Sequence, residues 1–257
     1  MANILFSWIN HVDTATLAAS SEAGSMTFGL VANPIIGKRW RTLDLNGYGQ
    51  ADFGANKTIG IVTLVFPRDT MGALAGTVRH RFDADGGAAG SGAAHDSGVI
   101  AIGAVEGYGY HVYIPPSPIT ARYWRWMYAA SGVGYIDTGR AWAGEAWQPE
   151  RNFSYGAGDT WDDLSRISVS DRSGAEFVDE RARRRLMDFA LEYMSEADRQ
   201  TVRELRRIVG ISRQILTVFD PGSPAKETIL GRLAETNPIL HTAFPIHSTT
   251  FRQRESL

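Results

Sequence analysis

The sequence predicts a mainly β protein, in which a β-sandwich is followed by a second β-sandwich domain flanked by one α-helix. Three observations support this class. The first part of the chain is rich in glycine and poor in charge, short segments rich in β-branched residues alternate with Gly/Pro turns, and only one stretch has a capped amphipathic helical pattern. Short strands joined by tight glycine turns are typical of a sandwich.

Composition restricts the possible classes of function. The formal net charge of −2 gives no overall attraction to nucleic acid or to an anionic membrane. The absence of cysteine excludes disulfides and thiolate metal sites. No apolar run reaches the ~20 residues of a membrane helix, and the N-terminus lacks the pattern of a signal peptide. We therefore expect a soluble protein without membrane insertion.

A shift in composition near residue 148 predicts the domain boundary. Residues 1–145 contain 21 of the 27 glycines and 21 charged side chains, whereas residues 146–257 contain 6 glycines and 33 charged side chains. We therefore expect two domains, 1–148 and 149–257, joined between Trp147 and Phe153.

The first domain contains the strands expected of a sandwich. In the segment 77–82, Val78, His80 and Phe82 alternate onto one face. Further strands are expected at 59–66, 109–114 and 134–142, and the glycine-rich segment 83–98 is expected to form a long loop.

The segment ARYWRWMY, residues 121–128, combines four aromatic residues with two arginines. Alternation along a strand assigns its side chains to two faces, Tyr123, Arg125 and Met127 on one and Trp124, Trp126 and Tyr128 on the other. Because aromatic side chains dominate protein cores, we expect Trp124 and Trp126 to be packed inside the sandwich. The alternative is an exposed platform on which a ligand stacks.

The second domain is expected to combine strands with one helix. Met187, Phe189, Leu191 and Tyr193 alternate onto one face of the segment 182–194, which favours a strand. Ser195 followed by Asp198 predicts a capped helix over about 196–209, which ends at Gly210. Its apolar stripe is formed by Val202, Leu205, Ile208 and Val209. Further strands are expected at 215–220, after which comes the turn 221–224, and within 228–235 and 240–257.

The histidines give no metal-binding pattern. They are His11, His80, His95, His111, His241 and His247, and no two have the i, i+4 or H-x-H spacing of a metal site. His80 and His111 lie on expected strands, where a hydrogen-bonded structural role is favoured. His95 begins the segment HDSG, which is expected to form a turn.

No other motif indicates catalysis. Asp162 and Asp163 are adjacent, so on a strand they face opposite sides, and their surroundings suit turns or caps. DADGG, 83–87, lacks the alternating ligands and closing Glu of a calcium loop, and GYGY, 107–110, lacks a nucleotide-binding context. We therefore expect no enzyme activity, no cofactor, and no catalytic or metal-binding residue.

The run RARRR, residues 181–185, is the densest cluster of charge. It is expected to be either a solvated strand face or a strip of salt bridges between subunits of a ring. Mixed charge on the strand 182–194 and on the exposed side of the helix suits a wet contact between copies. We therefore expect oligomerisation through residues after 148.

Residues 1–148 resemble a discoidin-like (F5/8 type C, galactose-binding-like) domain. The resemblance is carried by the order of Trp40–Arg41, ADFG (51–54), HDSG (95–98), the RYWRW strand 122–126 and the segment 137–144. It implies a jelly-roll sandwich in which the RYWR strand belongs to the framework. Some such domains bind a structural calcium, so an ion at 83–87 remains an alternative.

The rest of the chain resembles the hub domains of tail-tip and baseplate proteins of long-tailed bacteriophages. The similar segments are 179–205, 210–224, 229–235 and the ending FRQRESL, 251–257. This resemblance implies a minor tail protein of the virion, assembled in the host cytoplasm. It would be a structural component that forms a homo-oligomeric ring around the tail axis and contacts other tail-tip and baseplate proteins.

A different class of function is a carbohydrate-binding accessory protein that contacts a host-surface glycan. Trp40, Trp142 and Trp147 are the first aromatic residues to consider for such binding. An enzyme acting on surface glycans is a third hypothesis, which the absence of an acid/base pair makes the weakest.

Overall fold

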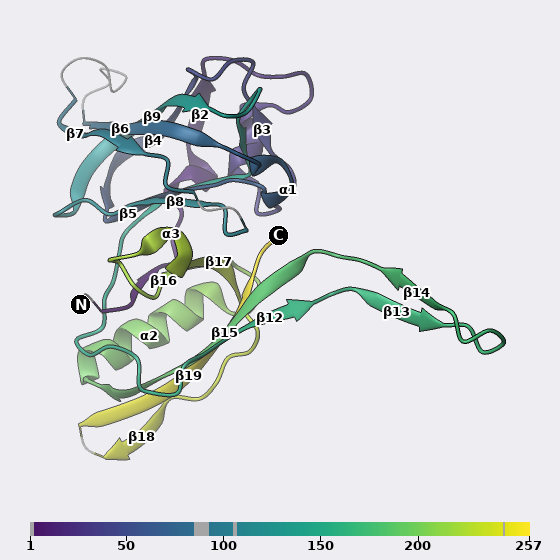
Figure 1. The fold of residues 1–257 in the computed structure, drawn as a ribbon. Helices are drawn as coiled ribbons and strands as arrows, with labels where there is room; N and C mark the ends of the chain where they lie inside the picture. Colours follow the sequence, from purple (N-terminus) through teal and green to yellow (C-terminus); the bar gives the residue numbers. More distant parts are fainter. Residues whose placement is uncertain (1–2, 85–92, 105–106, 244) are drawn as a thin grey trace. The chain divides into compact units, whose positions relative to one another are not determined.

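The computed structural model describes residues 3–84, 93–104, 107–243 and 245–257. The chain is mainly β and divides into two compact units (Figure 1). The first contains Met1–Gln148 and Leu216–Thr228, and the second contains Pro149–Ile215 and Ile229–Leu257. The segment 215–220, which the composition assigns to the second domain, therefore belongs largely to the first unit.

The first unit is a β-sandwich. One sheet has the strand order β2 (Thr16–Ala19), β4 (Tyr48–Ile59), β9 (Ile119–Ser131), β6 (Ala75–Asp83) and β7 (His95–Ala101). The other has the order β11 (Arg140–Gly144), β5 (Ile61–Val65) and β8 (Tyr110–Tyr113). Buried side chains of both sheets form one hydrophobic cluster, so the core lies between them.

Smaller elements complete this unit. β1 (Leu5–Ser7) pairs antiparallel with β16 (Ile215–Val218), and β3 (Trp40–Arg41) pairs with β10 (Asp137–Thr138). Short helices connect the strands: η1 (His11–Thr14), η2 (Phe28–Ala32), α1 (Arg68–Met71) and α3 (Pro224–Glu227).

The aromatic strand β9 is packed as expected. Trp124 and Trp126 are completely buried and Tyr128 almost so, whereas the alternate residues of β9 are partly exposed. Gly49 on the neighbouring strand β4 is the cross-strand partner of Trp126 and leaves room for its ring, because a Cβ at Gly49 would lie 2.5 Å from that ring. The packing interpretation is confirmed, and the stacking-platform alternative is wrong for Trp124 and Trp126.

The second unit places one helix against one face of a sheet. Its strands are β17 (Thr228–Leu233), β19 (Ile246–Glu255), β15 (Arg183–Met194) and β12 (Gly158–Asp163), in that order, with β18 (Leu240–Ala243) also paired to β19. α2 spans Glu196–Val209, as expected, and the Ser195 side chain accepts a hydrogen bond from the Asp198 N–H. Val202, Leu205 and Val209 bury its apolar stripe.

A bulge changes one expected side chain on β15. Met187, Phe189 and Leu191 are buried, as their alternation predicts, but Tyr193 is 57% exposed. The register of β15 against β19 shifts between Leu191 and Met194, so Met194 turns inward in its place. Alternation cannot anticipate an extra residue in the strand, which moves all later side chains to the other face.

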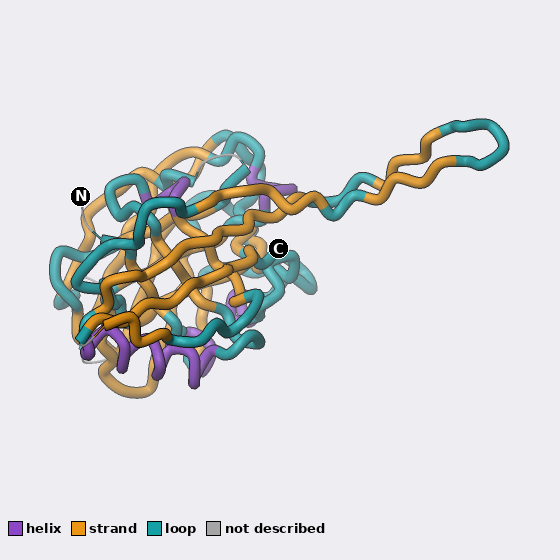
Figure 2. The backbone as a smooth tube through the Cα atoms, turned by 90° about the horizontal axis from the view of Figure 1, so that it is seen from below, coloured by secondary structure: helices purple, strands orange, loops and turns teal. Residues whose placement is uncertain are grey.

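A two-stranded β-ribbon extends from β12 and β15 (Figures 1 and 2). It contains β13 (Arg166–Val169) and β14 (Glu176–Asp179), which pair with each other and are exposed along their whole length. We term residues 164–182 the arm. β12, β13 and β14 were not expected, because the Asp and Ser residues in these segments are typical of turns. β7 was not expected either, and HDSG begins this strand where a turn was predicted.

Candidate functional site

The aromatic residues considered for sugar binding do not form a site. Trp40 is completely buried and donates its indole N–H to the Ser21 carbonyl at 2.9 Å. Trp142 is 1% exposed and donates to the Ser7 hydroxyl at 2.9 Å. Trp147 is half-buried against the Phe6 ring, 5.5 Å between centroids. Trp40 and Trp142 are inaccessible to a ligand, because both side chains are needed in the core.

The structure brings together two histidines that are far apart in the sequence. His80 Nε2 lies 2.9 Å from His111 Nε2 in the core of the sandwich. Trp124 donates its N–H to His80 Nδ1, and His111 Nδ1 donates to the Ile102 carbonyl. The structural role expected for His80 and His111 is confirmed. Their contact depends on the pairing of the sheets, which sequence spacing does not reveal.

The charged run 181–185 is neutralised within the chain. Arg183 binds Asp163 at 2.9 Å and Arg184 binds Asp162 at 2.7 Å, across the β12–β15 pair. Arg185 binds Asp159 at 3.1 Å, and Arg181 binds Asp179 at 2.6 Å. Arg181 and Arg183 are exposed, as expected for a solvated strand face, whereas Arg185 is buried. Salt bridges between subunits stay a prediction. Asp162 and Asp163 point to opposite faces and form no carboxylate pair.

Other candidate features are limited in what they support. The segment 83–87 lies mostly outside the described residues. Within the described part of the chain, no three or more His, Asp or Glu residues gather as a metal site would require. None of the described helices is long and apolar enough to cross a membrane.

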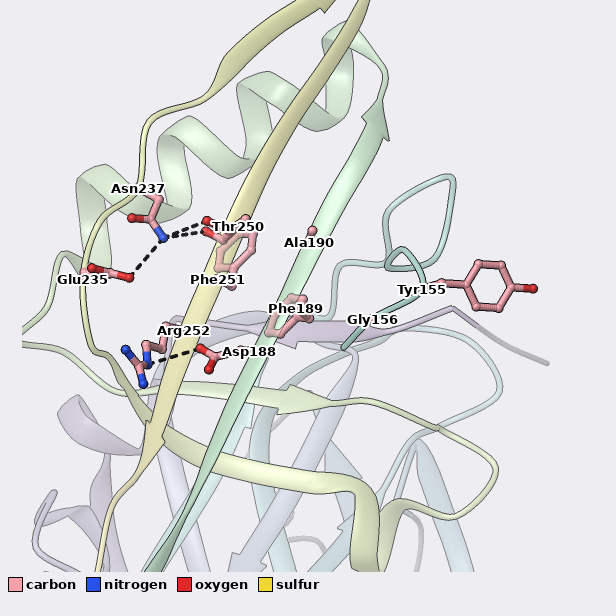
Figure 3. Close-up of a pocket in the computed structure, with 10 residues that line it drawn as sticks. All are labelled: Tyr155, Gly156, Asp188, Phe189, Ala190, Glu235, Asn237, Thr250, Phe251 and Arg252. Carbon is pink, nitrogen blue, oxygen red and sulfur yellow. Dashed lines mark hydrogen bonds and ion pairs between the residues drawn. The ribbon is translucent and has the colours of Figure 1, made fainter. Parts of the chain in front are cut away.

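The face of the second-unit sheet opposite α2 contains two adjoining depressions of about 220 and 200 Å³. Both are lined by Ala190, Thr250 and Asn237. Ala190 and Thr250 are cross-strand partners on β15 and β19, so their small side chains leave the floor low. We term this pair of depressions the trough; Figure 3 shows the larger one.

The trough has a charged end and two rims. At one end, Arg252 lies 3.3 Å from its cross-strand partner Asp188, and both side chains are about half exposed. Tyr155 and Gly156 line one side, and Glu235 and Asn237 line the other. Tyr155 points away from the depression (Figure 3) and is fully exposed. The floor between these rims is therefore two strands wide.

Arg206 on α2 holds one rim in place. Its guanidinium donates to the Asn237 carbonyl and, at 2.7 Å, to the Thr249 hydroxyl. The Asn237 side chain in turn donates to the Thr250 hydroxyl at 2.8 Å. This rim is thus fixed by hydrogen bonds within the chain.

The arm exposes apolar side chains on both faces. Ile167 and Val178 are cross-strand partners, exposed by 67% and 62%, and Val169 lies on the same face. The opposite face carries Phe177, which is 62% exposed. Its cross-strand partner is Ser168, and the next pair on that face is Arg166 with Asp179. An isolated two-stranded ribbon is marginally stable in water, and exposed apolar side chains of this kind are typical of interaction surfaces.

The first unit contains a surface cluster of arginine and tyrosine. The Arg41 guanidinium stacks 3.6 Å from the centroid of Tyr135, and it binds Asp137 through two hydrogen bonds of 2.7 and 2.8 Å. Arg39 lies 3.6 Å from Asp137 and binds Asp69 at 2.9 Å. Tyr135 is 39% exposed. The cluster presents a fixed aromatic ring beside hydrogen-bond donors, and no pattern in the sequence identified it.

No protein-family model matches this chain, and no curated protein sequence is significantly similar to it. Solved structures similar over about half of the chain are discoidin-like carbohydrate-binding domains. One is the family 32 carbohydrate-binding module of C. perfringens NanJ in complex with galactose, with 14% identity, a TM-score of 0.45, and coverage of 55% of this chain and 99% of that one. Another is a chitosan-binding module from Paenibacillus sp. IK-5, with 16% identity, a TM-score of 0.43, and coverage of 54% and 99%. A third is a Streptococcus pneumoniae fucose-binding module, with 11% identity, a TM-score of 0.40, and coverage of 53% and 95%. None of these comparisons points to a phage tail protein or a tail-hub domain.

Proposed function

We propose that this protein is a non-catalytic structural subunit that joins a larger assembly through its second unit. The observation that carries the proposal is the arm, a two-stranded ribbon that exposes Ile167, Val169, Phe177 and Val178 by more than half. Such a ribbon gains stability when a neighbouring molecule covers its apolar side chains. The assembly we propose is the tail tip or baseplate of a long-tailed bacteriophage, as the resemblance of the segments after residue 148 implies.

Sedimentation velocity over a concentration series tests this function. The full chain is compared with a variant in which residues 165–181 are replaced by Asn-Gly, a dipeptide that closes a two-residue hairpin between Leu164 and Ala182. We expect concentration-dependent association that the variant loses. Monomers at every concentration for both chains would contradict an arm-driven assembly. Electron microscopy of the associated species would then show whether it is a ring.

A second candidate function is glycan binding by the first unit, which the Arg39–Arg41–Tyr135 cluster favours. An exposed aromatic ring offers a surface for the apolar face of a sugar, and the guanidinium groups can donate to its hydroxyls. In a tail-tip assembly this would make the first unit the part that contacts a host-surface glycan. It also stands alone as the function of a carbohydrate-binding accessory protein.

A glycan array that includes galactose, fucose and chitosan oligosaccharides tests the second function. Those sugars are suggested by the names of the similar structures. Tyr135→Ala is expected to abolish binding, whereas Tyr155→Ala is the matched control, because Tyr155 is an exposed aromatic residue of the other unit. Equal loss of binding in both variants, or binding to no sugar, would contradict this candidate.

A further inference from the structure

We propose that the arm of one copy of this chain docks face to face across the trough of a second copy. The inference rests on the assembly function proposed above and identifies the contact within it. The floor of the trough lies on β15 and β19, and the arm is also a pair of antiparallel strands. The arm and the trough floor are therefore each two strands wide.

The arm extends away from the trough of its own copy (Figure 2). β15 runs without interruption from Arg183, at the base of the arm, to Asp188 and Ala190 in the trough floor. The arm continues beyond Arg183 away from these residues (Figures 1 and 2). The contact is therefore between copies, and it joins two different surfaces of the same chain, as in a ring or a filament.

The shapes of the two surfaces match at the level of cross-strand pairs. The low point of the trough is the pair Ala190 and Thr250, whose side chains are small. The high point on one face of the arm is Phe177, which stands beside the small Ser168. With β13 over β15 and β14 over β19, Phe177 fills the depression above Thr250 and Ser168 lies above Ala190.

The same arrangement matches the charges. Two residues along each strand from this contact, the trough carries Asp188 and Arg252, and the arm carries Arg166 and Asp179. Alternate residues of a strand share a face at a regular spacing, so Arg166 then faces Asp188 and Asp179 faces Arg252. Asp179 also binds Arg181 in its own copy, so its carboxylate would join two guanidinium groups.

The strand directions permit this alignment. Ala190 accepts a hydrogen bond from the Ser154 N–H, so when β15 is viewed from the trough running upward, β19 lies on its left. Ser170 donates to the Ala175 carbonyl, so in the same view of the Phe177 face, β14 lies to the right of β13. Turning the arm over to meet the trough therefore puts β13 on β15 and β14 on β19, both pairs running in the same direction.

Thiol cross-linking between copies tests the contact, because the chain has no cysteine of its own. Stacked sheets lie ~10 Å apart, too far for a disulfide, so a short bifunctional thiol reagent is required. Chains with Ser168→Cys and chains with Ala190→Cys are mixed, with tags that distinguish them. We expect a linked heterodimer. Val169→Cys, on the opposite face of the arm, is the matched control and is expected to give little product with Ala190→Cys.

Two further variants test shape and charge in the cross-linking pair. Phe177→Ala is expected to reduce the heterodimer and Val178→Ala to leave it unchanged, although both side chains are exposed by 62%. Exchanging Asp188→Arg with Arg252→Asp keeps the ion pair within the copy but reverses its direction. It is expected to abolish the product, and Arg166→Asp with Asp179→Arg on the arm is expected to restore it.

Three results distinguish the contact from the assembly function. If the Ser168→Cys pair yields no more linked heterodimer than the Val169→Cys control, the docking proposal is overturned. If the native chain nevertheless associates through the arm, the assembly function stands with a different contact. A heterodimer yield that neither Phe177→Ala nor the charge exchange changes also overturns the docking proposal. A specific heterodimer supports it, whether or not the native oligomer is stable in dilute solution.

Discussion

The hydrogen bonds of two buried histidines, His80 and His111, define which ring nitrogens carry protons. The Trp124 indole is only a donor, so His80 Nδ1 accepts and the His80 proton lies on Nε2. His80 then donates to His111 Nε2, and the His111 proton lies on Nδ1, directed at the Ile102 carbonyl. A second proton on either ring would set two donors against each other. Both imidazoles are therefore neutral in the folded protein.

Acid is expected to destabilise the protein through this pair. Burial lowers the pKa of His111 to about 4, and burial together with the neighbouring His111 holds the pKa of His80 well below 6.5. Unfolded histidines titrate near 6.5, so as the pH falls below that value the unfolded state binds protons that the folded state does not. The loss of unfolding free energy between pH 6.5 and 4 is about 3 kcal/mol for His111 alone.

Denaturant unfolding at a series of pH values measures this loss. Burial also lowers the pKa of His11, so a His11→Gln variant is the control that removes its contribution. The carboxyl groups of Asp52 and Asp96, whose pKa values are lowered to about 2 by Arg122 and Arg79, act mainly below this window. Stability that stays constant from pH 6.5 to 4 in the His11→Gln chain would contradict the prediction.

Trp126→Ala is expected to lower the free energy of unfolding by ~3–5 kcal/mol, because it empties a fully buried site. Its ring contacts those of Phe28 and Trp124, with centroids 5.5 and 4.4 Å away. Tyr123→Ala on the partly exposed face of the same strand is the matched control and is expected to cost much less. A ranking in the opposite order, measured by chemical denaturation, would show that the core is organised differently.

At the scale of elements, the arm and helix α2 are stabilised in different ways. α2 buries its apolar stripe and begins at a side-chain cap, with Glu196 paired to Arg199 in its first turn. The arm has no described residue buried below the surface, and its two strands contact chiefly each other. A helix of this kind is part of the folding unit, whereas the arm is stable only to the extent that its pairing or a partner holds it.

Replacing residues 165–181 by Asn-Gly is therefore expected to leave the melting temperature nearly unchanged. The variant removes β13 and β14 but keeps the paired residues of β12 and β15, including Asp163 with Arg183. Circular dichroism during heating measures the effect. A large drop in melting temperature would contradict this expectation and would mean that the arm contributes to the stability of the second unit.

Ser195→Ala is expected to cost ~1 kcal/mol of stability, the usual value of a lost helix cap. The Ser195 hydroxyl accepts a hydrogen bond from the Asp198 N–H at 3.2 Å, which leaves that donor unsatisfied in the variant. Ser195→Asp preserves an acceptor and is expected to retain most of the stability. Equal losses in both variants would assign the effect to something other than capping.

At the scale of the whole molecule, the chain passes between its two units more than once. It leaves the first unit after Gln148, returns for Leu216–Thr228, and leaves it again. The returning segment includes β16, which pairs with the N-terminal strand β1 through Leu5 and Val218. One segment of the expected second domain, Leu216–Thr228, therefore belongs to the first unit, although the composition of the chain changes only once.

In the variant whose residues 165–181 are replaced by Asn-Gly, limited trypsin treatment is expected to cut after the exposed Arg151, within the linker between residues 147 and 153. The two fragments are expected to remain associated, because β1 lies in one and β16 in the other. Mass spectrometry and native gel filtration give the two readouts. Sole cleavage within residues 182–194, or fragments that separate under native conditions, would contradict this organisation.

Local patterns in the sequence predict the class of the fold and much of its local detail. Alternation along β9 and β6 identified the buried faces that include Trp126 and His80, and the pattern from Ser195 to Gly210 located α2. These properties are encoded locally, because a strand has a period of two residues and a helix has one of 3.6. The sequence-based expectation of a mainly β chain that begins with a sandwich and contains the helix α2 is accordingly correct, whereas the second unit has α2 on one face of a sheet in place of a second sandwich.

Which residues come together from distant segments cannot be read from these local patterns. The contact of His80 with His111, the ion pairs of Arg183 and Arg184, and the low floor at Ala190 all depend on strand register, which brings residues from distant segments opposite one another. The strands of the arm could not be predicted from the sequence for a related reason. Its strands are not half-buried, so they lack the alternating pattern that burial on one face imposes on a sequence.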